Sequence, residues 1–129
     1  MNYEPRNKES LLKTVYKYLK DRGYENVKAD LLDTETPRMI VENISGDQFK
    51  PDITATHNEN SYIFELEMGN SFDNNKENFI KKCNVFQQYA SEHNGKLYLI
   101  VPIEYFDTIM TEVNKHYLEN IGILHFNNN

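Results

Sequence analysis

The sequence predicts an α/β (α+β) fold in which helices flank a central mixed β-sheet. Three segments have the apolar periodicity of amphipathic helices, and short strand-like runs with turn signals between them separate these segments. The run at residues 96–102 is almost wholly apolar, which is typical of a strand buried on both faces in a parallel or mixed sheet. The predicted order is helix, four strands, helix, strand, helix and strand.

The three predicted helices cover residues 8–21, 74–94 and 105–117. In the first, Gly23 follows the apolar stripe and is a suitable stop, because glycine adopts a positive φ at little cost. Asn74 with Glu77 three residues later resembles a capping box and predicts the start of the second. The apolar stripe of the first helix contains Leu11, Leu12, Val15, Tyr16 and Leu19.

The predicted strands cover residues 27–32, 39–44, 52–56, 61–68, 96–102 and 121–126. The alternation is clearest in residues 61–68, where Glu65 and Glu67 share one face and the other face is wholly apolar. An apolar second face favours a central position in the sheet. Residues 126–129 are predicted to be a disordered tail.

Composition indicates one domain spanning residues 1–129. A hydrophobic content of 39% and an aromatic content of 12% exclude a disordered chain. No apolar run reaches the length of a membrane span, no signal-peptide pattern is present, and the single Cys83 excludes a disulfide framework. We therefore expect a cytoplasmic protein without a membrane partner.

The net charge of −6 opposes general binding of nucleic acid, which depends mainly on Lys and Arg. Residues 1–28 differ from the rest, because they contain seven basic and four acidic residues. An ordinary solvated helix face explains this excess. Phosphate contacts by Lys13, Lys17 and Lys20 are the alternative.

Three acids carry the candidate chemistry: Asp52, Glu65 and Glu67. Residues two apart on a strand point the same way, so Glu65 and Glu67 lie together, and a tight turn brings Asp52 to the neighbouring strand. Converging carboxylates repel unless a cation or proton lies between them, and their oxygens are suitable ligands for Mg²⁺ or Mn²⁺. Ordinary solvent exposure of these acids is the alternative. The sequence contains no Gly-rich phosphate loop and no recognisable nucleophile–His arrangement.

The segment Phe49–Ala55, with Pro51-Asp52, followed by Tyr62–Glu67, resembles the PD-(D/E)XK nuclease superfamily. This group includes restriction endonucleases, Holliday-junction resolvases and small repair nucleases. The resemblance implies a restriction endonuclease-like core: a helix, a three-stranded meander that carries the motif, a helix and a strand. It also implies a divalent metal, Mg²⁺ or Mn²⁺.

In this resemblance, Asp52 and Glu65 match the two metal-binding acids, and Glu67 stands where the family usually has Lys. Three interpretations of this departure stay open. Glu67 acts as a further carboxylate toward metal or water, Lys81 or Lys82 of the next helix supplies the positive charge, or catalysis is lost.

Two further residues follow from the resemblance. Some relatives contribute a Glu of the first helix to the metal site, which here is Glu9; a first-turn Glu favoured by the helix dipole is its simpler interpretation. Many relatives place a polar residue of the second helix near the motif, which here is Gln87; a buried structural hydrogen bond is the alternative.

The leading hypothesis is a divalent-metal-dependent nuclease-like protein that hydrolyses DNA phosphodiester bonds. Its catalytic residues would be Asp52, Glu65, Glu67, Gln87 and Lys82, with Glu9 as a further metal ligand. DNA is a more suitable partner than RNA, and a homodimer would double the basic surface of the first helix. The alternative is a catalytically inactive nuclease-fold domain that binds nucleic acid or protein.

Overall fold

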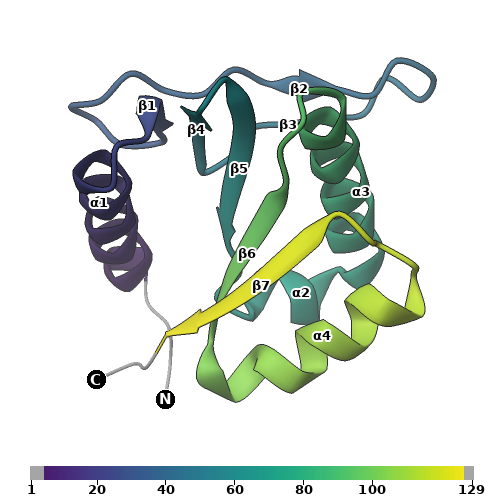
Figure 1. Cartoon of the computed structure of the whole chain (residues 1–129). Coiled ribbons are helices and arrows are strands. Elements are labelled where there is room, and N and C mark those ends of the chain that lie inside the picture. Colours follow the sequence, from purple (N-terminus) through teal and green to yellow (C-terminus); the bar gives the residue numbers. More distant parts are fainter. Residues whose placement is uncertain (1–4, 127–129) are drawn as a thin grey trace.

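The computed structural model describes residues 5–126 (Figure 1). Its main elements form a five-stranded mixed sheet with helices on both faces, as the sequence predicts. In chain order the elements are α1 (Pro5–Asp21), β1 (Glu25–Ala29), β2 (Ile40–Val41), β3 (Gln48–Phe49), β4 (Ile53–His57), β5 (Asn60–Leu66), α2 (Asn70–Asn74), α3 (Lys76–Glu92), β6 (Leu97–Pro102), the 3-10 turn η1 (Ile103–Tyr105), α4 (Phe106–Lys115) and β7 (Ile121–Phe126).

The strand order in the large sheet is β1-β4-β5-β6-β7. The first three strands form an antiparallel meander, whereas β6 runs parallel to β5 and β7 runs parallel to β6. Each parallel connection contains a helix, α3 for the first and α4 for the second. The motif strand β5 is therefore central, as its apolar second face predicts.

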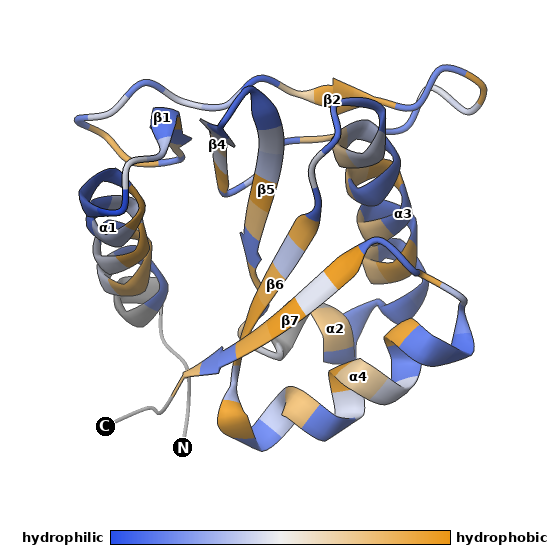
Figure 2. Cartoon of the chain, in the orientation of Figure 1, coloured by the Kyte–Doolittle hydropathy of each residue, from blue (hydrophilic) through white to orange (hydrophobic). Residues whose placement is uncertain are grey.

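Two apolar cores lie on the two faces of this sheet. On one face α1 packs against β1, β4 and β5, with Leu12, Leu19 and Phe64 buried between them. On the other face α3 and α4 cover β5, β6 and β7, with Phe86, Leu99 and Ile109 buried. The hydropathy colours agree, because the side of α1 that faces the sheet is the more hydrophobic one (Figure 2).

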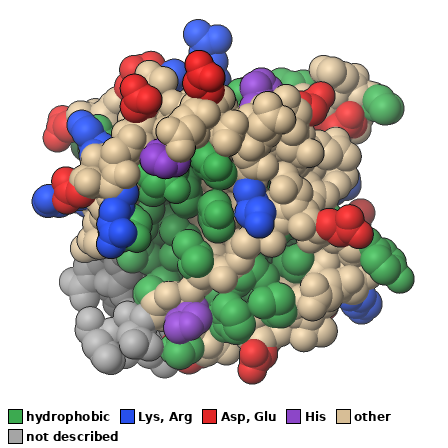
Figure 3. Space-filling view, viewed as in Figure 1, with side chains coloured by type: hydrophobic (Ala, Val, Ile, Leu, Met, Phe, Trp, Pro, Cys, Tyr) green, Lys and Arg blue, Asp and Glu red, His purple; other side chains and the backbone are tan. Residues whose placement is uncertain are grey.

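Helix α1 covers only part of its face. At the edge of this core, Phe64 stacks on Tyr98 with ring centroids 5.4 Å apart, and the ring of Tyr62 also contacts that of Tyr98. Figure 3 shows hydrophobic side chains gathered on this face of the molecule. Leu124 of β7 is 47% exposed.

The strand predicted at residues 39–44 is shorter than expected and does not belong to the large sheet. Only Ile40–Val41 is extended, and it pairs with an unpredicted strand, β3, in a separate two-stranded ribbon. Ile40 is buried in the core that α3 shares with the sheet. The ribbon therefore contacts α3 and does not join the large sheet. A turn around Gly46, where φ is +78°, connects the two short strands.

Several predicted boundaries also need correction. The first strand is Glu25–Ala29, because the main chain turns after Ala29, where the Leu31 N–H donates to the Ala29 carbonyl. A short helix, α2, precedes α3, whose N-cap is Asn75 and not Asn74, since the Asn75 side chain accepts from the Asn78 N–H. Phe126 belongs to β7 and not to a tail, while residues 127–129 lie outside the described chain.

The predicted end of α1 is confirmed. Gly23 has a φ of +88°, and the Tyr24 N–H donates to the Leu19 carbonyl. This hydrogen bond closes the last turn with a glycine in the left-handed conformation. Within residues 5–126, no helix combines the length and apolar character that crossing a membrane requires.

Candidate active site

The two acids of the motif, Asp52 and Glu65, lie side by side on neighbouring chain segments. Asp52 directly precedes β4, and Glu65 lies in β5, one residue after the Ile53–Phe64 pair. The Asp52 main-chain N–H donates to Glu65 Oε1 at 2.6 Å, and the Leu66 N–H donates to Asp52 Oδ2 at 2.8 Å. Both residues are buried, so ordinary solvent exposure is the wrong interpretation for them.

Each of these carboxylates also contacts a lysine. Lys8 Nζ of α1 lies 3.3 Å from Asp52 Oδ1, and Lys82 Nζ of α3 lies 3.1 Å from Glu65 Oε2. The two helices that supply the lysines cover opposite faces of the sheet. Each carboxylate therefore has one oxygen on a main-chain N–H and the other on an ammonium group.

The position of Lys82 agrees with one interpretation of the altered motif, in which the next helix supplies the positive charge. Its side chain is 18% exposed, and it points from α3 to the motif strand. Lys81, the other candidate, is exposed on α3. Of the two lysines, Lys82 is the one that the structure brings to the acids.

Burial and charge shift the protonation of this group. Burial, followed by the adjacent Asp52 carboxylate, raises the pKa of Glu65 to about 7, although Lys82 opposes the shift. Burial alone would lower the pKa of Lys82. The Glu65 and Glu67 carboxylates raise this pKa by more than burial lowers it, so it lies above its ordinary value. Glu65 therefore gains or loses a proton near neutral pH, whereas Lys82 stays charged.

Glu67 has a structural contact that the motif does not predict. Its Oε1 accepts from the Gly69 N–H at 2.9 Å and from the Phe72 N–H at 3.3 Å, at the beginning of α2. Only 2% of the residue is exposed. A carboxylate that binds the free N–H groups of a helix start stabilises that start. Glu67 thus holds the chain that leaves the motif strand.

Gln87 lies away from these acids. Its Oε1 accepts from the Asn120 N–H at 3.1 Å, and its Nε2 donates to Asn84 Oδ1 at 3.1 Å. These contacts join α3 to the segment before β7, near the beginning of β6. The Glu67 N–H, in contrast, donates to the Ile100 carbonyl near the end of that strand. The structural alternative for Gln87 is the one that these contacts support.

Glu9 lies close to the acids but is directed to Lys13. Lys13 Nζ is 3.3 Å from Glu9 Oε1, and the Glu9 side chain is 63% exposed. Glu9 nevertheless lines a hollow of about 310 Å³ that Asp52 and Lys8 also line. The predicted group of four carboxylates is not assembled, since among residues 5–126 no three His, Cys, Asp or Glu side chains are placed to hold one ion.

The sequence interpretation missed two residues at this site, Lys8 and Asp30. Asp30 follows β1 and lines the same hollow; its N–H donates to the Asp52 carbonyl, and its carboxylate lies 3.4 Å from Lys50 Nζ. Lys8 directly precedes Glu9 in the first turns of α1. This neighbourhood was the one sign in the sequence that Lys8 could also reach the acids. Only the packing of α1 on β4 shows which of the two side chains reaches the motif.

Comparison of the chain with models of protein families, with curated proteins and with solved structures finds no match. The site offers a buried pair of carboxylates, one of which titrates near neutral pH, and two ammonium groups that contact them.

Proposed function

We propose that this chain is a divalent-metal-dependent nuclease-like protein that hydrolyses DNA phosphodiester bonds. The observation that carries the proposal is the buried Asp52–Glu65 pair, which occupies the motif positions on two adjacent segments and has Lys82 beside it. Buried carboxylates in contact are unfavourable unless a cation or a proton compensates their charge. Lys8 and Lys82 compensate this charge here, and a divalent cation that displaces Lys8 from Asp52 would do the same.

The donor set suits Mg²⁺ or Mn²⁺. Both ions prefer carboxylate oxygens, and Mg²⁺ is commonly held by one or two carboxylates with water and substrate phosphate completing its shell. Asp52 and Glu65 would hold the ion. Lys8 is already a cation at Asp52, and its 41% exposed side chain can move aside. A bound ion would supply Lewis acidity at the phosphate and lower the pKa of its water.

The residues of the chain have separate tasks in this proposal. Lys82 stays charged and supplies the positive charge for which the family motif uses a Lys on the strand. Glu65 holds or releases a proton near pH 7, so a cation at the site would favour its ionised form. Glu67 positions α2 and is a structural residue of the site rather than a metal ligand.

The order of the elements supports the resemblance on which the proposal draws. Helix α1 precedes the β1-β4-β5 meander, the motif lies on β4 and β5, and α3 leads to the parallel strand β6. The β2-β3 ribbon is an insertion between the first two strands of the meander. This order supports the proposal, because the resemblance implies a helix, a meander, a helix and a strand.

The alternative is a nuclease-fold domain without catalysis that binds nucleic acid or protein. Two observations favour this alternative. Asp52 and Glu65 are each already paired with a lysine, and Glu67 binds main-chain N–H groups at the start of α2. In that case the two lysines replace the metal permanently, and Asp52 and Glu65 serve stability alone.

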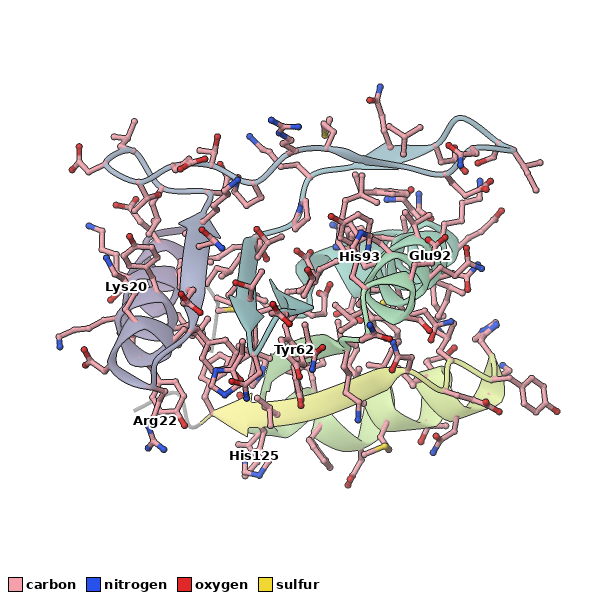
Figure 4. All side chains as sticks on the ribbon, turned by 45° about the horizontal axis from the view of Figure 1, so that its top comes forward. Lys20, Arg22, Tyr62, Glu92, His93 and His125 are labelled. Atoms are coloured by element: carbon pink, nitrogen blue, oxygen red, sulfur yellow. The ribbon has the colours of Figure 1, made fainter. Side chains whose placement is uncertain are left out.

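A nicking assay on supercoiled plasmid with Mg²⁺ or Mn²⁺ separates the two functions. We expect metal-dependent nicking by the wild type and a loss of about 100-fold or more in Asp52→Asn, because a metal ligand is removed without a change of shape. Lys82→Gln should be similarly impaired. Glu92→Gln, an exposed acid at the far end of α3 (Figure 4), serves as the control and should nick like the wild type. Wild-type protein that does not nick any DNA form with either ion would contradict the proposal.

A further inference from the structure

A second hollow, of about 380 Å³, lies between the segment 38–41 and the strands β1, β4 and β5. We call it the basic pocket, because Lys28 and Arg38 line it together with the polar residues Asn26, Thr54, Thr56 and Ser61 and six apolar or aromatic residues, and within the described part of the chain no acidic residue lines it. The hollows beside α1, beside α3 and between α4 and β7 all include at least one acid. In a chain of net charge −6, a pocket of this composition is unusual.

Several donors of the basic pocket have no acceptor in the part of the chain that the structure describes. Among residues 5–126, the Arg38 side chain and the Thr54 and Ser61 hydroxyls make no hydrogen bond or ion pair. Lys28 Nζ lies 3.2 Å from Glu35 Oε2, but that carboxylate is 74% exposed and can be displaced. A guanidinium, an ammonium and hydroxyl groups around one hollow are the donors that bind a phosphate group.

The basic pocket lies on the α3 face of the sheet, and the candidate active site lies at the end of the same strands, where Lys82 reaches it from the α3 side and Lys8 from the α1 side. Ile53 and Ala55 of β4 are buried toward α1, so Thr54 and Thr56 point to the other face, where Thr54 lies beside Ile63 and Thr56 beside Ser61. The residue two positions before Thr54 is Asp52. Two residues of a strand span roughly 7 Å, a distance that one nucleic-acid strand can bridge.

We propose that the basic pocket binds a backbone phosphate of the nucleic-acid strand whose scissile phosphate lies at Asp52 and Glu65. The identity of this ligand rests on the proposed nuclease function, whereas the capacity of the pocket to bind a phosphate group rests on its donors. Arg38 and Lys28 supply the charge, and the two hydroxyls complete the contacts to the phosphate oxygens. This pocket, and not the lysines of α1, then offsets the acidic net charge: Lys13 and Lys17 are each paired with an acid four residues away.

The test measures binding without metal, so that it does not depend on cleavage. Fluorescence anisotropy of a labelled ten-nucleotide single strand is followed in EDTA at several salt concentrations. We expect the double variant Lys28→Gln/Arg38→Gln to lose about tenfold in affinity, with a salt dependence shallower by about one unit of slope. The matched control, Lys20→Gln/Arg22→Gln, removes the same two residue types at the end of α1 (Figure 4) and should lose less than twofold.

The outcomes are distinguishable from those of the nicking assay. Equal losses in the two double variants, or no loss in the pocket variant, would overturn the phosphate site even where the wild type nicks DNA. A selective loss without any nicking would leave the pocket as a strand-binding site and reject the nuclease. If 5′-AMP binds as tightly as the single strand and displaces it, the pocket is a mononucleotide site and the proposed strand contact is wrong.

Discussion

The two ends of the central strand β5 are fixed by different chemistry. At its beginning, main-chain groups and neutral side chains join β5, β6 and α3: Gly95 lies against the Ser61 carbonyl, and Gln87 and Asn120 bind each other. At its end, buried carboxylates contact two lysines and the main chain. The same strand thus combines a neutral, closely packed end with a charged one.

The difference indicates which end is suited to the proposed catalysis. Neutral hydrogen bonds and close packing stabilise a fold at little cost, whereas buried ion pairs are often no more stable than the apolar groups that could replace them. Charges of this kind are typical of functional sites, where pKa values are shifted. The neutral end should therefore contribute stability at every pH, whereas the stability contributed by the charged end should depend on pH and its charges should serve the proposed activity.

The largest effect on stability is expected for Gly95→Ala at the neutral end. A Cβ at this position would lie 1.5 Å from the Ser61 carbonyl oxygen, which belongs to the main chain and cannot turn aside. We expect a loss of about 3 kcal/mol or more in the free energy of unfolding, which thermal unfolding followed by circular dichroism measures. Gly46→Ala is the control: it has open space around it but a φ of +78°, and should lose about 1 kcal/mol. Similar losses of stability in both variants would contradict the assignment of the Gly95–Ser61 contact as a determinant of stability.

The second effect is a pH dependence of stability that arises from Glu65. Its pKa is about 7 in the folded state and about 4.5 ordinarily, so the folded protein keeps a proton that the unfolded chain releases. The stability from this group is complete below about pH 4.5 and is lost as the pH rises to about 7, by roughly 3 kcal/mol. The difference between wild type and Glu65→Gln in urea unfolding from pH 4.5 to 8 isolates this group. A flat difference would show that Glu65 titrates normally.

A smaller effect is expected for Gln87→Ala. It removes the acceptor for the Asn120 N–H and should cost about 1–2 kcal/mol in stability without changing nicking. Gln88→Ala, an exposed neighbour, is the control and should be neutral. Loss of nicking with unchanged stability in Gln87→Ala would instead restore this residue to the catalytic group.

Much of the sheet could be predicted because its pattern is local. The alternation of residues 61–68 and the apolar run at 96–102 correctly indicated strands at the centre of the sheet, and Gly23 marked the end of α1. The ribbon at residues 40–49 was missed as such, because Ile40 is fixed by the core under α3, which is distant in sequence.

One part of the geometry of the candidate site could be predicted. The adjacency of Asp52 and Glu65 follows from strand geometry and a tight turn, and the structure confirms it. The choice between Lys8 and Glu9, and the contact of Glu67 with α2, depend on how two helices begin and pack. No periodicity in the sequence contains that information.

Calorimetric titration of Mn²⁺ at pH 7.5 into wild type, Glu65→Gln and Glu9→Gln tests the metal site most directly. We predict one ion bound per chain by the wild type, affinity at least tenfold weaker in Glu65→Gln, and affinity within twofold of wild type in Glu9→Gln, whose carboxylate is paired with Lys13. No binding by the wild type at millimolar Mn²⁺, or equal binding by the wild type and Glu65→Gln, would contradict the assignment of Asp52 and Glu65 as metal ligands.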